Sequence, residues 1–218
     1  MTHLEKELKA LKGDTVEMWQ LVLSQLQKAS HSLQTFDKDF AHEVVANEKR
    51  VNSMELNIDR DCENIFALYN PVAVDLRLVL ATLKIVNNLE RIGDIAEGIS
   101  LFIISEKETF DKSLLKSTRF NEMFEGAIKT VEDVLKAFET EDTKLARSIF
   151  KQDEILDEIN VEANKNIAVF ITNNLEKTEQ ALNVLSIIRR LERVGDQSKN
   201  IAEEIIFYLE AKVLKHVK

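Results

Sequence analysis

Glycine and proline are scarce in this chain, and this scarcity limits the folds that it can adopt. The 218 residues include 5 glycines and 1 proline, whereas average usage would give roughly 26 in a chain of this length. The hairpins of β-sheet proteins and the strand-to-helix turns of doubly wound folds depend on these residues. With 44% hydrophobic and 31% charged residues, the composition predicts an all-α protein made of long helices.

The charge balance and the single cysteine limit the partners and the cellular compartment that we expect for this protein. The formal net charge is −9, which argues against a nucleic-acid partner and is compatible with bound cations. No stretch approaches the roughly 20 apolar residues of a membrane span, and no charged-then-apolar leader is recognisable. Cys62 has no second cysteine with which to form a disulfide. We therefore expect a soluble, cytoplasmic protein.

Breaks in the helical pattern are few. Pro71 ends one helix and fits the first turn of the next. The polar, aperiodic stretch at residues 105–113 is typical of a linker, and Asn173-Asn174 is a candidate turn because asparagine tolerates left-handed backbone. Together with two shorter turns, these breaks predict six long helices at residues 3–35, 38–69, 71–104, 114–139, 142–173 and 177–214.

The chain contains an internal repeat. The hexapeptide LERIGD at residues 89–94 returns as LERVGD at residues 191–196, 102 positions later. Apolar positions upstream of the two hexapeptides match as well. Each half then holds three helices with the hexapeptide on the third. We therefore predict two tandem three-helix bundles, with the domains at residues 1–106 and 112–218.

Each hexapeptide holds a Glu and an Asp four residues apart, which places them on one helix face. Chance gives roughly six such pairs in a chain with this acid content, but these two recur at equivalent positions beside the apolar face. Each pair is interrupted by a glycine, Gly93 or Gly195, although glycine inside a helix costs about 1 kcal/mol relative to alanine. The glycines indicate close approach of a neighbouring helix or of a ligand. The pairs are Glu90/Asp94 and Glu192/Asp196.

Folding each helix pair into a hairpin places further acids opposite these pairs. In the first half Glu48 faces Asp94 and Asn52 faces Glu90; in the second half Asp153 faces Asp196 and Asp157 faces Glu192. Converging carboxylates repel one another and need protons or cations, and oxygen ligands suit hard metal ions. We predict a metal site with more than one ion on each bundle, weaker in the first half because Asn52 carries no charge. The alternative is salt bridging between helices through arginines, namely Arg91, Arg189, Arg190 and Arg193.

The segment PVAVDLR at residues 71–77, followed by LERIGD, resembles the PhoU family, and LERVGD followed by Asn200-Ile201-Ala202-Glu203 resembles it again. The resemblance covers nearly the whole chain as two PhoU domains. It implies two three-helix bundles whose acidic motifs bind multinuclear iron or zinc clusters. The oxygen ligands alone leave manganese or magnesium as alternatives. The motif acids carried over are Glu90/Asp94, Glu192/Asp196, Asp153/Asp157 and Glu48.

The same resemblance implies a function. PhoU-like proteins are cytoplasmic accessory proteins of a phosphate ABC transporter that restrain phosphate uptake. They signal phosphate sufficiency to a sensor histidine kinase, and they commonly form homodimers. This chain departs from the family pattern at Asn52, where an aspartate is usual, and at Ile95, Gly98 and Gln197 near the hexapeptides.

The leading interpretation is therefore a non-enzymatic, metal-binding adaptor protein. One alternative is a metal-dependent phosphate-ester hydrolase, since a multimetal carboxylate site can activate water; the sequence offers no obvious general base for it. The other alternative is a purely structural helical scaffold in which the acids are salt-bridged.

Overall fold

The computed structural model describes residues 2–214. This part of the chain contains no strand and is almost entirely helical, which confirms the all-α prediction. It consists of α1 (His3–Thr35), α2 (Lys38–Tyr69), α3 (Ala73–Ser105), α4 (Lys112–Ser117), α5 (Phe120–Thr140), α6 (Thr143–Asn173), the short 3₁₀ helix η1 (Leu175–Lys177) and α7 (Thr178–Glu210).

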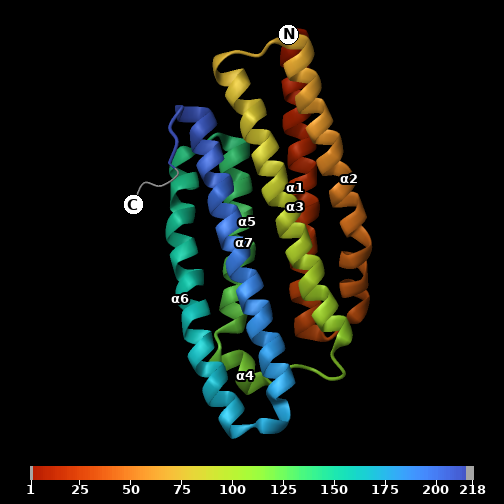
Figure 1. The fold of residues 1–218 in the computed structure, drawn as a ribbon, viewed down its shortest axis with the longest axis vertical. Coiled ribbons are helices and arrows are strands. Elements are labelled where there is room, and N and C mark those ends of the chain that lie inside the picture. Colours follow the sequence, from red (N-terminus) through yellow and green to blue (C-terminus); the bar gives the residue numbers. More distant parts are fainter. Residues whose placement is uncertain (1, 215–218) are drawn as a thin grey trace.

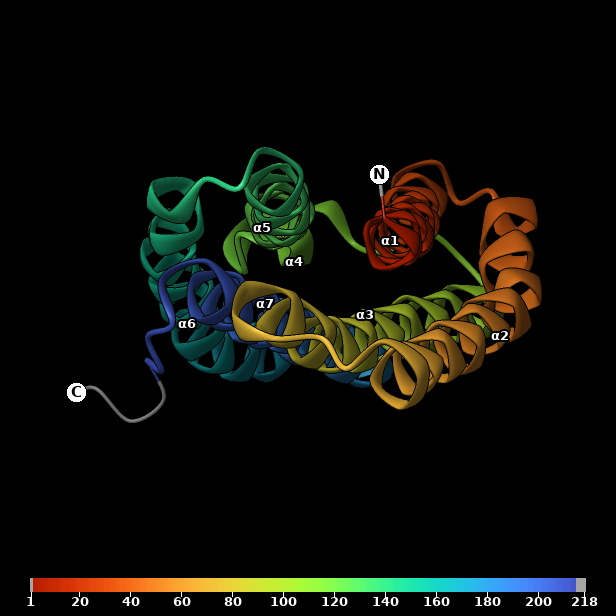
Figure 2. The ribbon, with the colours of Figure 1, turned by 90° about the horizontal axis from the view of Figure 1, so that it is seen from above.

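The long helices lie side by side in an elongated bundle (Figure 1). Seen from above, α3 and α7 form the middle of one side, α1 and α5 cover them, and α2 and α6 lie at the outer flanks (Figure 2). The helices α1–α3 belong to one repeat and α5–α7 to the other. The repeats are joined mainly through α3 against α7, with α1 against α5 as a second contact.

Local signals explain most helix ends. Thr2 forms a capping box with Glu5 at the start of α1, and the Asp37 and Asp142 carboxylates accept backbone N–H bonds at the starts of α2 and α6. Asn70 ends α2 in a left-handed conformation, with φ of 46°. α3 begins at Ala73 and not at Pro71 as predicted, because the backbone of Val72 is extended. The chain reverses direction between Asn70 and Val72.

Two other predicted ends are wrong. The predicted helix at 114–139 is two helices, α4 and α5, because Arg119 is left-handed with φ of 52°. The guanidinium of Arg119 is held by Glu122 and Glu162, each at 2.9 Å. The last helix ends at Glu210 and not at residue 214, since Ala211 is left-handed and its N–H bonds to the Phe207 carbonyl.

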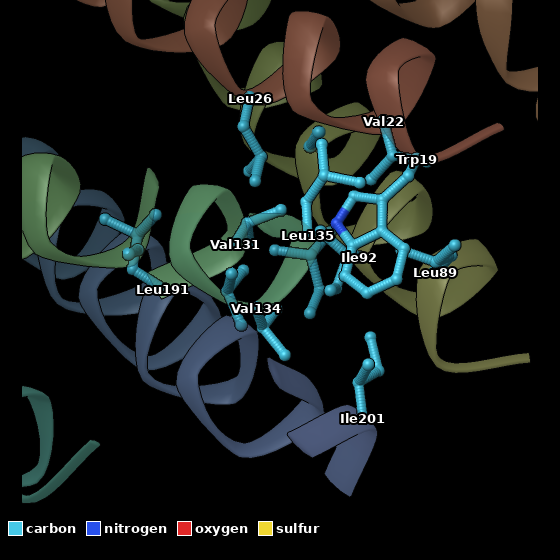
Figure 3. Packing of buried hydrophobic residues seen from close by; sticks show 14 of the residues in the cluster. Trp19, Val22, Leu26, Leu89, Ile92, Val131, Val134, Leu135, Leu191 and Ile201 are labelled. Atoms are coloured by element: carbon cyan, nitrogen blue, oxygen red, sulfur yellow. The ribbon is translucent and has the colours of Figure 1, made fainter. Parts of the chain in front are cut away.

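The two repeats share one hydrophobic core. The Trp19 indole of α1 is fully buried and packs against the Phe138 ring of α5, with 5.7 Å between the ring centroids. The Phe138 ring in turn packs against the Tyr208 ring of α7, with 6.3 Å between the centroids. Side chains from α1, α3, α5 and α7 gather in this core (Figure 3), including Val22, Leu26, Leu89, Ile92, Val131, Val134, Leu135, Leu191 and Ile201. The repeats are thus packed into one body, although each follows the predicted three-helix plan.

Polar contacts set the register between α3 and α7. Lys84 Nζ donates to the buried Glu204 carboxylate at 3.0 Å, and Asn200 Nδ2 donates to Asn88 Oδ1 at 3.4 Å. These pairs show that the two helices run antiparallel. None of the helices in the described residues has the length and apolar character needed to cross a lipid bilayer.

Candidate functional site

The hairpin geometry brings the predicted carboxylates together in both repeats. α2 packs along α3, and α6 packs along α7, as predicted. Among the neighbouring charges, Asp94 of α3 does most to raise the pKa of Glu48 of α2. In the second repeat, Asp153 of α6 is the charge that does most to raise the pKa of Asp196 of α7.

Two clusters can now be defined by their residues. The first acidic cluster consists of Glu48 and Glu55 on α2 with Glu90, Asp94 and Glu97 on α3. The second acidic cluster consists of Asp153 and Asp157 on α6 with Glu192 and Asp196 on α7.

A buried carboxylate lies at the base of each cluster. Glu48 is 5% exposed and Asp153 is 1% exposed, while Asp94, Asp157 and Asp196 lie at the surface. Gln25 of α1 donates to Glu48 Oε2 at 3.4 Å, and Lys199 of α7 donates to Asp153 Oδ2 at 2.7 Å. The second buried carboxylate therefore has a cationic partner and the first has a weak neutral one.

The glycines of the hexapeptides make room for these two carboxylates. A Cβ atom at Gly93 would lie 3.1 Å from Glu48 Oε2, and a Cβ atom at Gly195 would lie 2.8 Å from both Asp153 Oδ1 and a methyl group of Leu156. Each glycine thus allows the neighbouring helix to place a carboxylate against its backbone. This answers the question raised by the sequence, because the close approach is that of a side chain from the preceding helix.

The electrostatics follow from burial and crowding. Burial, followed by the charge of Asp94, raises the pKa of Glu48 to about 7, although Gln25 opposes the shift. Burial and neighbouring carboxylates also raise the pKa of Glu90 and Glu192. Lys199 partly opposes the same effect on Asp157 and Asp196. Both clusters therefore hold carboxylates whose ionised forms are disfavoured by burial and by their neighbours.

The donor set suits a hard cation in its chemistry. Glu48 Oε1, Asn52 Oδ1 and Asp153 Oδ1 are buried and have no hydrogen-bond partner in the described structure, and unpaired buried oxygens are costly. In the geometry of the described residues, no three His, Cys, Asp or Glu side chains are arranged to hold a metal ion. A cation would use the buried oxygens and would require surface carboxylates to rotate inward. The role of these residues as metal ligands stays a prediction.

The alternative of arginine salt bridges does not describe this structure. Among the described ion pairs, none within 4 Å joins Arg91, Arg189, Arg190 or Arg193 to a motif acid. Arg189 instead donates to Asn164 Oδ1 at 2.9 Å. Arg190 lies over the Phe102 ring, 5.4 Å from its centroid. Within residues 2–214, the one ion pair to a motif acid comes from Lys199.

Sequence reasoning missed several neighbours of the motif acids. Glu55 lies seven residues after Glu48, and Glu97 lies seven residues after Glu90, so helical spacing could have found both. Lys199 lies three residues after Asp196 on the same face. Gln25 comes from α1, and only the packing of a third helix reveals it.

Comparison with known proteins now decides the family. The PhoU domain model matches residues 15–103 and 120–205. The chain belongs to the PhoU family. It is 35% identical over 216 residues to the phosphate-specific transport system accessory protein PhoU homolog 1 of Thermotoga maritima, covering 98% of this chain and 91% of that protein.

Other PhoU proteins agree in sequence and structure. The phosphate-specific transport system accessory protein PhoU of Escherichia coli is 31% identical, with 97% of this chain and 87% of that protein covered. The crystal structure of PhoU from Pseudomonas aeruginosa is 30% identical and superposes with a TM-score of 0.90, covering 96% of this chain and all of that one. The two matched segments fit the tandem repeat predicted from the hexapeptides.

Replacing Gly195 with alanine tests the close approach to Asp153. Alanine gains about 1 kcal/mol of helix propensity over glycine, but its Cβ would overlap Asp153 and Leu156. Gly13 of α1 is the matched control, since a Cβ there meets nothing within 4 Å. We expect Gly195→Ala to be less stable than Gly13→Ala by about 1–3 kcal/mol, the usual cost of overpacking. Urea denaturation measures the difference, and equal stabilities would contradict the packing.

The raised pKa of Glu48 predicts a pH dependence of the metal-free protein. Because the folded pKa of about 7 exceeds the unfolded value of 4.5, the folded state keeps a proton that the unfolded state has lost. Stability is then greatest below the unfolded pKa and is lost as pH rises towards 7, by about 3 kcal/mol.

We expect Glu48→Gln to remove most of this loss, whereas Glu63→Gln, which alters an exposed glutamate of α2, should leave it unchanged. The measurement is the free energy of unfolding at pH 5 and pH 7.5 in the presence of a chelator. The same slope in Glu48→Gln as in the unaltered protein would rule out Glu48 as the source.

Proposed function

We propose that this protein is an accessory regulator of a phosphate uptake system, acting by binding and not by catalysis. The proposal rests on the similarity to relatives named phosphate-specific transport system accessory proteins. The matched region covers almost all of this chain and most of each relative. In this proposal the protein works in the cytoplasm and docks on the ATPase of a phosphate ABC transporter and on a sensor histidine kinase. It restrains uptake when phosphate is sufficient, and it forms a homodimer.

We further propose that the two acidic clusters are metal sites, with iron or zinc as the expected ions. A bound ion would neutralise carboxylates that now repel one another. The residues of the chain provide the framework: Glu48 and Asp153 supply a buried oxygen each, and Gly93 and Gly195 let those oxygens reach the facing helix.

This arrangement supports a binding role for the clusters. Each cluster joins the two helices of one hairpin, α2 with α3 or α6 with α7. Fixing a hairpin changes the charge and the rigidity of the surface that it offers to a partner.

Metal content tests the proposed sites. We expect roughly stoichiometric iron, zinc or manganese in the purified protein by elemental mass spectrometry, and a fall in the Asp94→Ala/Asp196→Ala double variant, which removes the hexapeptide aspartate from each cluster. The control is Glu125→Ala/Glu139→Ala, which removes two exposed acids of α5 outside the clusters. Absence of metal from all three proteins, even after incubation with these ions, would end the metal proposal and leave the regulatory one standing.

Phosphate uptake tests the regulatory role. In a bacterium lacking its own PhoU-family gene, we expect expression of this chain to lower radiolabelled phosphate uptake at high external phosphate and to silence a phosphate-starvation reporter. The Asp94→Ala/Asp196→Ala variant should do neither, whereas Glu125→Ala/Glu139→Ala should behave as the unaltered chain. Unchanged uptake and unchanged reporter activity, with the protein present at normal levels, would refute the regulatory function.

A further inference from the structure

The two acidic clusters occupy equivalent places in the repeat but differ by the sign of one charge. Position 97 holds a glutamate, and position 199, which is 102 residues later, holds a lysine. Both residues lie three positions after the hexapeptide aspartate, Asp94 or Asp196, and therefore on the side of the helix that faces the cluster.

In the second cluster Lys199 already acts as the counter-ion. Its ammonium donates to Asp153 Oδ2 at 2.7 Å, and Asp153 is 1% exposed. Hydrogen bonding to Asp153 and the charges of Asp196 and Asp157 raise the pKa of Lys199. The ammonium is therefore bonded to Asp153 and attracted by the charges of two further carboxylates, so the buried Asp153 has a positive charge beside it.

The first cluster has no comparable cation. Glu48 is 5% exposed, its Oε1 atom is buried without a hydrogen-bond partner, and its Oε2 atom receives only the 3.4 Å bond from Gln25. Glu97 and Glu90 add negative charge at Glu48 beyond that of Asp94. Among the ion pairs of residues 2–214, none involves a member of this cluster. Asp153 Oδ1 is also unpartnered, but the other oxygen of Asp153 is paired with Lys199, so of these two buried carboxylates Glu48 gains more from a bound cation.

We propose that the two clusters bind divalent cations unequally, with the first as the stronger site and Lys199 as a built-in competitor at the second. This inference rests on the metal binding proposed above. It reverses the order expected from the sequence, where Asn52 suggested that the first site is the weaker one. Asn52 leaves the first cluster one carboxylate short, but the neighbouring Glu55 and Glu97 add two carboxylates to it.

The physical reason is competition for the same oxygen atoms. A cation at the second cluster must break the ion pair between Lys199 and the buried Asp153 and move the ammonium into water. Lys199 has room for this movement, because its side chain is 38% exposed. A cation at the first cluster displaces no ammonium, only the proton of Glu48 where that carboxyl is protonated, and it relieves the repulsion around Glu48.

Manganese binding to single-cluster variants tests the ranking. Asp153→Asn weakens the second cluster and leaves the first, while Glu48→Gln does the opposite, and both substitutions preserve side-chain shape. Free Mn²⁺ after equilibrium dialysis is measured by electron paramagnetic resonance. We expect Asp153→Asn to bind Mn²⁺ at least about tenfold more tightly than Glu48→Gln.

Removal of the lysine tests its role as competitor. In the Glu48→Gln background, Lys199→Met should tighten Mn²⁺ binding at the second cluster by about tenfold or more. The control, in the same background, is Lys151→Met, which removes an exposed lysine of α6 two residues from Asp153. Conversely, Glu97→Lys in the Asp153→Asn background should weaken binding at the first cluster, since it places a positive charge at the half-buried position equivalent to Lys199.

The outcomes separate this inference from the proposal on which it rests. If the unaltered protein binds no Mn²⁺, Zn²⁺ or iron, metal binding itself fails. If it binds metal but Glu48→Gln and Asp153→Asn bind it equally well, or if Lys199→Met has no larger effect than Lys151→Met, only the unequal clusters are refuted. Circular dichroism and thermal unfolding confirm that each variant is folded before binding is compared.

Discussion

A carboxylate buried against a glycine is the constraint on which the rest of this structure depends. Glu48 lies over Gly93 and Asp153 over Gly195, each inside the contact between two helices of a hairpin. A Cβ atom at Gly195 would come within 2.8 Å of the Asp153 and Leu156 side chains, and one at Gly93 within 3.1 Å of Glu48, so these side chains would have to shift. A buried carboxylate without a partner is costly, so each hairpin needs compensation from a proton, a lysine or a metal ion. The glycine in the hexapeptide and the acid on the preceding helix therefore form one unit, although about 40 residues separate them in the chain.

The contact between the repeats shows how one backbone plan accommodates different side chains. Asn88 pairs with Asn200 across the antiparallel α3 and α7. The positions equivalent to these two residues in the repeat are Arg190 and Gly98, which also lie against each other, with the guanidinium occupying the space that a side chain at residue 98 would need. Two side chains of medium size, Asn88 and Asn200, thus correspond in the repeat to one long side chain, Arg190, and one residue without a side chain, Gly98. The glycine that departs from the usual family pattern is explained by this exchange.

The sequence predicted the helices and the facing acids well, because both depend on local spacing. Asn70, Pro71 and Asp142 mark helix ends through their own backbone preferences. The break at Arg119 could not be predicted, since arginine has no preference for left-handed backbone and is held there by contacts with Glu122 and Glu162. The shared core was missed for a similar reason. Packing of Trp19 against Phe138 joins residues from the two repeats, and the repeat pattern describes each repeat alone.

The charge difference between positions 97 and 199 has a consequence for signalling that follows from the proposed ranking. A divalent cation brings two positive charges to either cluster. At the second cluster it takes the place of the Lys199 ammonium at the buried Asp153, and the ammonium remains on the same surface. At the first cluster it displaces no side chain, and the group that leaves is the proton of Glu48 where that carboxyl is protonated. Cation binding would therefore move a surface lysine on the second repeat and only neutralise carboxylates on the first, a difference that two identical repeats could not offer to a partner.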